Sequence, residues 1–321
     1  MIVLCHFEEG TIREVSRDEI APLLQNEKNT VWVDAEVSDP QLKDLLTGVF
    51  HFHPLSIEDA LSEFHHPKTE VFENYLFFTL PLIAPSVNGQ RCFRIIHLAF
   101  FWGRNFVVSV KSSAIDFFPK LQETVGSASE TMAMGPDFLM ERILHGVFEE
   151  TAPCIEDIHQ QIDRLEERVF KGGSDEDFST LFQLRKDVLD LRHVLNAEEG
   201  VIRHLSSGEL SQICPECLPY LHDVHDHIYR LSSEAESCQL WITALFSAHQ
   251  TQLSEKTNAI MKHLTLVATT VLPLTVVTSF FGMNFLTLPG LRHPAGWLFV
   301  SGGMLLAVIV LFLFFKKRRW F

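Results

Sequence analysis

The segment TSFFGMNFLTLPG, residues 278–290, places polar groups at the end of a long uncharged run. Gly282, Met283 and Asn284 stand there in place of the charged residue that commonly anchors such a run. The Asn284 side chain offers a carbonyl oxygen, and the backbone carbonyl of Gly282 is open to contact because glycine has no Cβ. Neutral oxygens of this kind accept hydrogen bonds from water without holding a cation as strongly as a carboxylate does.

A stripe of polar and slim residues precedes this segment. Its members follow one another at alternating steps of three and four: Asn258, Met261, Thr265, Ala268, Leu272, Thr275 and Ser279. This spacing places them on one face of a helix. Hydroxyl groups in a membrane are costly unless they face protein or water, so the stripe indicates either a water-filled path or packing between helices through Thr and Ser.

Two uncharged runs are long enough to cross a membrane. One extends from Lys262 to Arg292, and the other extends from Arg292 to Lys316. Each is longer than the stretch of about 20 apolar residues that spans a hydrocarbon core of about 30 Å, so we predict membrane helices at residues 264–281 and 296–315. A buried hairpin of a water-soluble protein is the alternative, and the adjoining Lys-Lys-Arg-Arg sequence disfavours it.

Charge is divided unevenly along the 321 residues. All 41 Asp and Glu lie at or before Glu255, together with 19 Lys and Arg, whereas the chain after Glu255 carries seven Lys and Arg and no acid. Arg292 is the only Lys or Arg between the two spans, whereas the other six of these basic residues lie before the first span or after the second. The positive-inside rule therefore places both termini in the cytoplasm of a bacterial-type inner membrane. The N-terminal MIVLCHFEEG lacks a basic signal-peptide region, and we expect the six cysteines to be reduced.

Residues 1–125 mix strand-like and helix-like segments. The runs at 31–37 and 75–83 are rich in β-branched and aromatic residues, and AFFWGRNFVVSVK at 99–111 is typical of a β-hairpin. This part contains no phosphate loop, nucleophile elbow or paired-carboxylate motif that would indicate an enzyme. We therefore predict an α/β domain without catalytic activity.

Two heptad-like helices follow. Their apolar residues step by three and four: Ile155, Ile158, Ile162, Leu165 and Val169 in the first, and Leu181, Leu184, Val188, Leu191 and Leu195 in the second. Gly172 and Gly173 end the first helix and Ser174 can cap the second, so we expect antiparallel packing. Their other faces are acidic, which suits either a solvated surface or a field that concentrates cations.

A very long helix is predicted next, because neither Gly nor Pro occurs between Pro219 and Pro273. One helix over residues 220–279 would be about 90 Å long at about 1.5 Å per residue. Such a helix would join the aqueous part to the membrane without a hinge.

The sequence KTNAIMKHLTLVATTVLPLTVVTSFFGMNF, followed by a short loop, a second span and a basic terminus, resembles the CorA-type divalent-cation transporters. That family is defined by Gly-Met-Asn at the end of its first membrane helix. The resemblance extends upstream through PYLHDVHDH at 219–227, QLRKDVLDLRHVL at 183–195 and HHPKTEVFENYLFF at 65–78. It implies a funnel-shaped homopentamer, in which five first membrane helices line one pore and the second spans form an outer ring.

The resemblance also implies roles for individual residues. Gly282, Met283 and Asn284 would form a selectivity filter that hydrogen-bonds the water shell of Mg²⁺, an ion that dehydrates reluctantly. The pore-lining and gating residues would be Asn258, Met261, Leu264, Thr265, Ala268, Leu272, Thr275 and Ser279. The larger apolar members of this set would form a constriction that closes by excluding water.

Asp223 falls where the family places a carboxylate for a regulatory metal between neighbouring cytoplasmic domains. Cytoplasmic cation bound there would favour the closed state. An ordinary acid on a helix surface is the alternative, and the sequence does not identify a partner carboxylate for Asp223.

The loop after the filter departs from the family pattern. It reads FLTLPGLRHPAG and lacks the acids that commonly follow the motif. Attraction of Mg²⁺ to this mouth should therefore be weaker, and Co²⁺, Ni²⁺ or Zn²⁺ are alternative substrates. A proton-coupled zinc transporter of the same superfamily is the nearest alternative function, and a membrane-tethered sensor or scaffold without transport is another.

Thiols and imidazoles gather just before and after residue 220. Cys214, Cys217, His222, His225 and His227 lie close together in the sequence. One C-x-x-C with nearby histidines has plausible zinc chemistry, but a structural zinc site usually has two such pairs. A reduced loop beside a histidine-bearing helix face is the simpler interpretation.

Together these features predict an α+β protein with an N-terminal α/β cytoplasmic domain, long antiparallel helices and a stalk helix that continues into a two-helix transmembrane region. We expect a divalent metal cation as substrate and regulator, no permanently bound cofactor, and no nucleic acid among its partners. The expected partners are the lipid bilayer, divalent metal ions and further copies of the chain. The predicted segments are the α/β domain at 1–125, acidic helices at 126–218, the stalk at 219–263, the first span at 264–285, the external loop at 286–295, the second span at 296–315 and the basic tail at 316–321.

Overall fold

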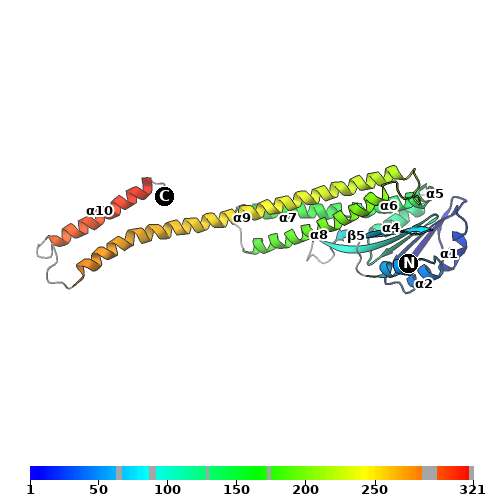
Figure 1. The fold of residues 1–321 in the computed structure, drawn as a ribbon, viewed down its shortest axis with the longest axis horizontal. Coiled ribbons are helices and arrows are strands. Elements are labelled where there is room, and N and C mark those ends of the chain that lie inside the picture. Colours follow the sequence, from blue (N-terminus) through cyan, green and yellow to red (C-terminus); the bar gives the residue numbers. More distant parts are fainter. Residues whose placement is uncertain (63–66, 87–91, 128–129, 172–174, 284–294, 318–321) are drawn as a thin grey trace. The chain divides into compact units, whose positions relative to one another are not determined.

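The computed structural model describes residues 1–62, 67–86, 92–127, 130–171, 175–283 and 295–317 (Figure 1). Contacts divide the chain into two compact units, Met1–Leu245 and Phe246–Phe321. The helix α9, Leu218–Phe281, contributes to both units. The segment boundaries predicted from the sequence divide these units more finely and remain predictions.

A seven-stranded sheet lies at the centre of the first unit. Its strand order is β2-β1-β3-β7-β6-β5-β4, in which β3 and β7 are parallel and the other neighbours are antiparallel. The strands are β1 (Ile2–His6), β2 (Ile12–Glu14), β3 (Thr30–Glu36), β4 (Lys68–Val71), β5 (Tyr75–Pro85), β6 (Phe93–Gly103) and β7 (Phe106–Lys111). The strands predicted at 31–37 and 75–83 and the hairpin predicted at 99–111 are thereby confirmed.

Helices cover both faces of this sheet. Alternate residues of each strand point to opposite sides, so each strand contributes apolar residues to both faces. Val31, Val33 and Ala35 of β3 belong to a core shared with the helices α1 (Arg17–Leu24), α2 (Leu42–Gly48) and α3 (Pro54–Leu61). Trp32 belongs to the other side, where its ring centroid lies 6.4 Å from that of Phe118 in α4 (Phe117–Ser127). Burial on both faces explains why β5 reads as a continuous apolar run.

A buried ion pair joins β3 to β7. The Lys111 ammonium contacts the Asp34 carboxylate, and both side chains are less than one-tenth exposed. Asp34 also accepts hydrogen bonds from Ser109 Oγ at 2.9 Å and from Gln122 Nε2 at 2.8 Å. These bonds compensate for the removal of both charges from water.

Further helices follow α4 and lead to α9 along the chain: α5 (Glu130–Ala133), α6 (Pro136–Glu149), α7 (Ala152–Phe170) and α8 (Asp175–Leu205). All ten apolar residues predicted for the inner faces of α7 and α8 are buried. Arg168 Nη1 lies 3.1 Å from Asp177 Oδ1, and farther from this connection Gln161 of α7 and Asp187 of α8 both hydrogen-bond to Cys92 Sγ, so the two helices are antiparallel as predicted. Gly172, Gly173 and Ser174 lie outside the described residues.

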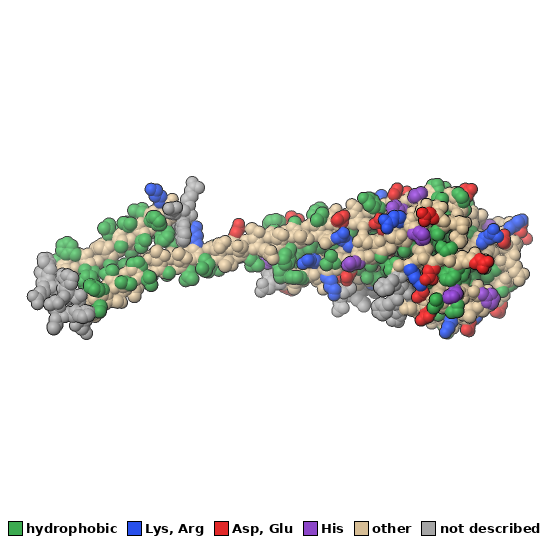
Figure 2. Space-filling view, viewed as in Figure 1, with side chains coloured by type: hydrophobic (Ala, Val, Ile, Leu, Met, Phe, Trp, Pro, Cys, Tyr) green, Lys and Arg blue, Asp and Glu red, His purple; other side chains and the backbone are tan. Residues whose placement is uncertain are grey.

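The helix α9 changes character along its length. Its buried residues recur at steps of three and four and stop at Leu245: Leu221, Val224, Ile228, Leu231, Ala235, Cys238, Ile242 and Leu245. Both α9 and α10 (Gly296–Lys317) are long and apolar enough to cross a membrane. Figure 2 shows acidic side chains spread over the first unit and hydrophobic side chains along the second. The predicted α+β class, with two apolar C-terminal helices, is confirmed.

Candidate functional site

The stripe predicted on α9 is continuous and open in a single chain. Each of its seven members, and Leu264 beside it, is exposed: Asn258, Met261, Leu264, Thr265, Ala268, Leu272, Thr275 and Ser279. Leu272 is 69% exposed, although it is one of the most apolar residues of this helix. No residue of the described part of the chain covers this face.

The stripe faces away from α10. Leu266 and Thr270 line a groove between α9 and α10. The stripe residue Ala268 stands two positions after Leu266, and the stripe residue Leu272 stands two positions after Thr270. A helix turns about 100° per residue, so two positions correspond to a rotation of about 200°. The second apolar helix therefore lies beside one side of α9, across the groove, and leaves the stripe on the opposite side.

Threonine hydroxyls on the stripe present acceptors to the outside. Thr265 Oγ1 donates to the carbonyl of Met261 at 2.8 Å, and Thr275 Oγ1 donates to the carbonyl of Val271 at 2.9 Å. A hydroxyl has one donor and two acceptor lone pairs. Because each proton is already bonded to the helix backbone, these oxygens remain as acceptors for water molecules.

The glycine of the Gly-Met-Asn motif stands directly after the last residue of α9. Its amide donates to the carbonyl of Thr278 at 2.9 Å, and a Cβ at this position would lie 3.2 Å from that same oxygen. A side chain at position 282 would therefore be in tight contact with the end of α9, a contact that glycine avoids. Met283 is 46% exposed, whereas Asn284 and the loop that follows it to residue 294 lie outside the described residues.

Asp223 is exposed on the part of α9 that belongs to the first unit. Burial raises the pKa of the Glu141 carboxyl in α6, and the negative charge of Asp223 adds to this shift. Nearby, the ring centroids of His145 and His227 lie 5.7 Å apart, and burial lowers the pKa of His227. Glu141 lies far from Asp223 along the chain, and no shared motif in the sequence links α6 to α9.

The five thiol and imidazole candidates do not converge on a metal site within the described part of the chain, where no group of three or more His, Cys, Asp or Glu is placed to hold a metal ion. The thiol of Cys217 is buried and donates to the carbonyl of Asp137 at 3.4 Å. The amide of Cys214 donates to Asp137 Oδ2 at 2.7 Å, while His222 is exposed. Burial raises the pKa of the Cys214 thiol to about 11, so this thiol is protonated at neutral pH.

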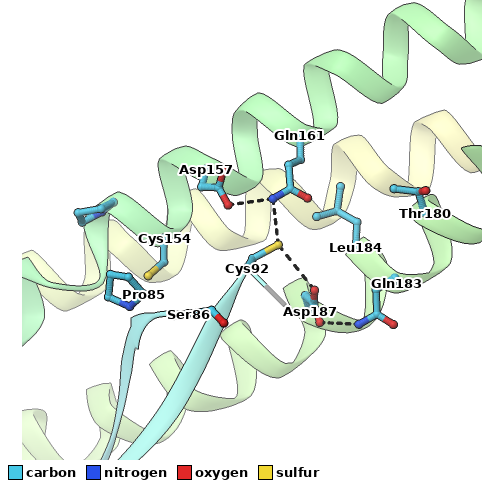
Figure 3. Close-up of a pocket in the computed structure, with 11 residues that line it drawn as sticks. Pro85, Ser86, Cys92, Cys154, Asp157, Gln161, Thr180, Gln183, Leu184 and Asp187 are labelled. Carbon is cyan, nitrogen blue, oxygen red and sulfur yellow. Dashed lines mark hydrogen bonds between the residues drawn. The ribbon is translucent and has the colours of Figure 1, made fainter. Parts of the chain in front are cut away.

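A cavity of about 430 Å³ opens between the ends of β5 and β6 and the helices α7 and α8 (Figure 3). Gln161 Nε2 donates to Cys92 Sγ at 3.2 Å and to Asp157 Oδ2 at 2.8 Å, and the Cys92 thiol donates to Asp187 Oδ2 at 3.6 Å. Burial raises the pKa of Cys92 to about 11 and that of Cys154 to about 12. Both groups are therefore protonated thiols at neutral pH, and the polar atoms of the cavity bond mainly to one another.

The comparisons with known proteins agree on one family. A model of the family described as CorA-like Mg²⁺ transporter proteins matches residues 27–317. The chain is 28% identical over 275 residues to the cobalt/magnesium transport protein CorA of Thermotoga maritima. The aligned region covers 84% of this chain and 77% of that protein.

Solved structures show the same architecture. The complete structure of the CorA magnesium transporter from Methanocaldococcus jannaschii matches with a TM-score of 0.80 and 18% identity, over 100% of this chain and 99% of that one. The ZntB cytoplasmic domain from Vibrio parahaemolyticus matches with a TM-score of 0.67 and 11% identity, over 79% of this chain and 98% of that domain. At these identities the likeness shows the fold.

The α/β unit continues through α9, whose C-terminal part is apolar enough to span a membrane, and α10 adds a second apolar helix. The chain belongs to the CorA-like Mg²⁺ transporter family, whose model covers most of its length. The family membership inferred from the sequence is thereby confirmed. Because members of this family are ion transporters, the prediction that the protein is not an enzyme is confirmed as well.

Proposed function

We propose that the protein is a passive channel for hydrated divalent cations, built from several copies of the chain. The exposed stripe on α9, opposite the side that packs on α10, carries this proposal. Two spans of one chain cannot enclose a pore, but copies of α9 arranged around an axis would bring their stripes together. The number of copies is five by family resemblance.

Each part of the stripe has a separate task in this proposal. The oxygens of Thr265 and Thr275 accept hydrogen bonds from the water shell of the passing ion. Met261, Leu264 and Leu272 form an apolar constriction that stops flow when water leaves it. Asn258 forms a polar ring before the constriction, while Ala268 and Ser279 are small enough to let the hydrated ion pass.

The selectivity filter in this proposal consists of Gly282, Met283 and Asn284. Uncharged oxygens bind a cation weakly enough to release it again, and they leave the water shell of Mg²⁺ in place. Met283 packs beside the ring and does not ligate. The acid-free loop that follows favours Zn²⁺, Co²⁺ or Ni²⁺ as alternative substrates, and proton-coupled zinc transport is the second candidate function.

Regulation is assigned to Asp223 on the cytoplasmic unit. A divalent cation between Asp223 and an acid of a neighbouring copy would favour the closed state, and loss of that cation would allow the units to separate. Asp223 is exposed on α9, so its carboxylate is open to a cation shared with a neighbouring copy. Both termini lie in the cytoplasm by the distribution of basic residues.

Ion flux in proteoliposomes tests the proposal. The purified protein is reconstituted, and uptake of Mg²⁺, Co²⁺, Ni²⁺ and Zn²⁺ is followed in turn with fluorescent indicators, with and without a pH step. Flux of divalent cations that ignores the pH step supports the channel. Zinc flux that follows the pH gradient would favour the second candidate, and no flux of any of the four ions would contradict both.

A further inference from the structure

The groove between the two apolar helices lies outside the proposed ion path. It has a volume of about 400 Å³, and its lining includes His263, Leu266 and Thr270 from α9 and Val308, Phe312 and Phe315 from α10. All of these residues belong to the unit Phe246–Phe321. None of them is a member of the stripe, so an occupant of the groove would not enter the pore.

The walls of the groove suit a hydrocarbon chain. Apart from His263 and Thr270 the named lining residues are aliphatic or aromatic, and the Thr270 hydroxyl already donates to the carbonyl of Leu266 at 2.8 Å. Phe315, at 7% exposure, is the buried residue of α10, whereas Phe312 remains 53% exposed along the groove. An acyl chain here would cover apolar surface without leaving a polar group unsatisfied.

One end of the groove is basic. The helices α9 and α10 run in opposite directions (Figure 1), so His263 near the start of the apolar part of α9 and Phe315 near the end of α10 line the same end of the groove. Lys316 and Lys317 follow Phe315 in the last turn of α10, where both are exposed. No Asp or Glu occurs after Glu255 to neutralise them.

We propose that this groove binds one anionic phospholipid per chain. Its acyl chain packs against Leu266 and Phe312, and its phosphate lies beside His263, Lys316 and Lys317. Basic pockets between membrane helices are typical sites for acidic headgroups, and the combination of an apolar groove with a basic end favours a lipid over a free phosphate. The proposal rests on insertion of α9 and α10 in a membrane, and it is independent of which cation crosses.

Native mass spectrometry of the full-length protein tests the binding. The protein is equilibrated in detergent with phosphatidylglycerol, phosphatidylcholine or glycerol phosphate, and the adducts retained on each chain are counted. We expect one retained phosphatidylglycerol per chain, at least tenfold less phosphatidylcholine, and no retained glycerol phosphate. Equal retention of the two lipids, or retention of glycerol phosphate, would overturn the proposal.

Matched variants locate the lipid. Val308→Trp fills the groove, whereas Val310→Trp adds the same side chain at a position that is 56% exposed and does not line it. Lys316→Gln with Lys317→Gln removes the basic end, and Lys171→Gln is the charge control in the first unit. We expect tenfold weaker retention in the groove-filling and double-lysine variants only. Unchanged retention in Val308→Trp would contradict the assignment.

A photo-crosslinking residue at Phe312 separates a lipid from a neighbouring chain, even if a tryptophan variant does not fold. With p-benzoylphenylalanine at this position, illumination should attach phosphatidylglycerol to the chain. Attachment to a second copy of the chain in place of lipid would show that a neighbouring helix occupies the groove and would overturn the proposal. None of these experiments measures ion flux, so a negative result for lipid binding is distinguishable from failure of the transport proposal.

Discussion

Thr270 and Leu272 lie on opposite sides of α9, although only one residue separates them. Thr270 lines the groove against α10, whereas Leu272 is 69% exposed on the stripe. The same helix therefore has one side that lines the groove beside α10 and another side that is left for water or for other copies. This division allows the two sides to be tested with equivalent substitutions.

Thr275→Val and Thr270→Val form such a matched pair. Valine keeps the shape of threonine but removes the hydroxyl oxygen, which faces the proposed pore only at Thr275. A lost hydrogen bond is worth about 0.5–1.5 kcal/mol, so we expect Thr275→Val to lower divalent flux about twofold to tenfold. Thr270→Val should leave the flux unchanged. Equal flux of both variants in proteoliposomes would contradict the assignment of the stripe to the pore.

Asn284→Ala should abolish selective divalent uptake while the oligomer stays intact. The substitution removes the side-chain oxygen that would contact the water shell of the ion, without adding bulk or charge. Uptake is measured in proteoliposomes, and size-exclusion chromatography checks the assembly. Wild-type flux in liposomes that carry this variant would refute the filter.

Asp223→Ala should weaken inhibition by divalent cation on the cytoplasmic side. Loss of one carboxylate ligand would shift the inhibition curve by about tenfold in concentration, which corresponds to about 1.4 kcal/mol. Asp226→Ala, an exposed acid three positions later on α9, is the control and should leave the curve in place. Coincident curves for the Asp223 variant and the wild type would count against a regulatory site.

Glu198 in α8 provides a test of stability against pH. It is fully buried, neither carboxyl oxygen has a hydrogen-bond partner among the described residues, and burial raises its pKa well above the usual value of a glutamate. Above a pH of about 4.5 the unfolded chain loses this proton while the folded chain keeps it. Stability therefore falls as pH rises, by up to about 1.4 kcal/mol per pH unit, until the folded pKa is passed.

Glu198→Gln should remove that dependence. We expect the thermal midpoint of the variant in detergent to exceed that of the wild type at pH 7, and the difference to shrink as the pH falls toward 5. Glu166→Gln on the exposed side of α7 is the control. A difference between wild type and Glu198→Gln that stays constant from pH 5 to 8 would contradict the buried, neutral carboxyl.

Lys111→Met should destabilise the first unit strongly. The substitution leaves the Asp34 carboxylate buried without its cation, and breaking one partner of a buried pair costs about 3–5 kcal/mol. Thermal unfolding in detergent measures the loss, with Lys28→Met as an exposed control, since Lys28 pairs with Glu8 at the surface. Equal midpoints for the two variants would show that the buried pair contributes no more than a surface pair.

Much of the architecture could be predicted because it depends on local periodicity. The steps of three and four in α7 and α8 identified their buried residues, and the two uncharged runs identified the apolar helices. The strand β1 was missed, since the short run IVLCH becomes a strand through its pairing with β2 and β3. The start of β6 and the short β4 were missed for the same reason.

The candidate site divides in the same way. The stripe on α9 follows from spacing along one helix, but the side of α9 that packs on α10 could not be read from spacing. The closeness of Cys214, Cys217 and His222 in sequence suggested a possible metal site. In the structure, Asp137 of α6 accepts hydrogen bonds from the amide of Cys214 and from the thiol of Cys217. Neighbours in sequence do not converge when a residue from a distant helix forms the better hydrogen bonds.

The sequence by itself determined the long helices from residue 155 onward, the two apolar segments, the family and the residues that share one face of α9. The tertiary structure decided that this face lies opposite α10, that Asp137 bonds to both Cys214 and Cys217, and that Glu198 is buried without a hydrogen-bond partner among the described residues. The reason is physical: a helix repeats about every 3.6 residues, so one stretch of sequence fixes its faces, whereas the group that meets each face is brought there by the folding of distant segments.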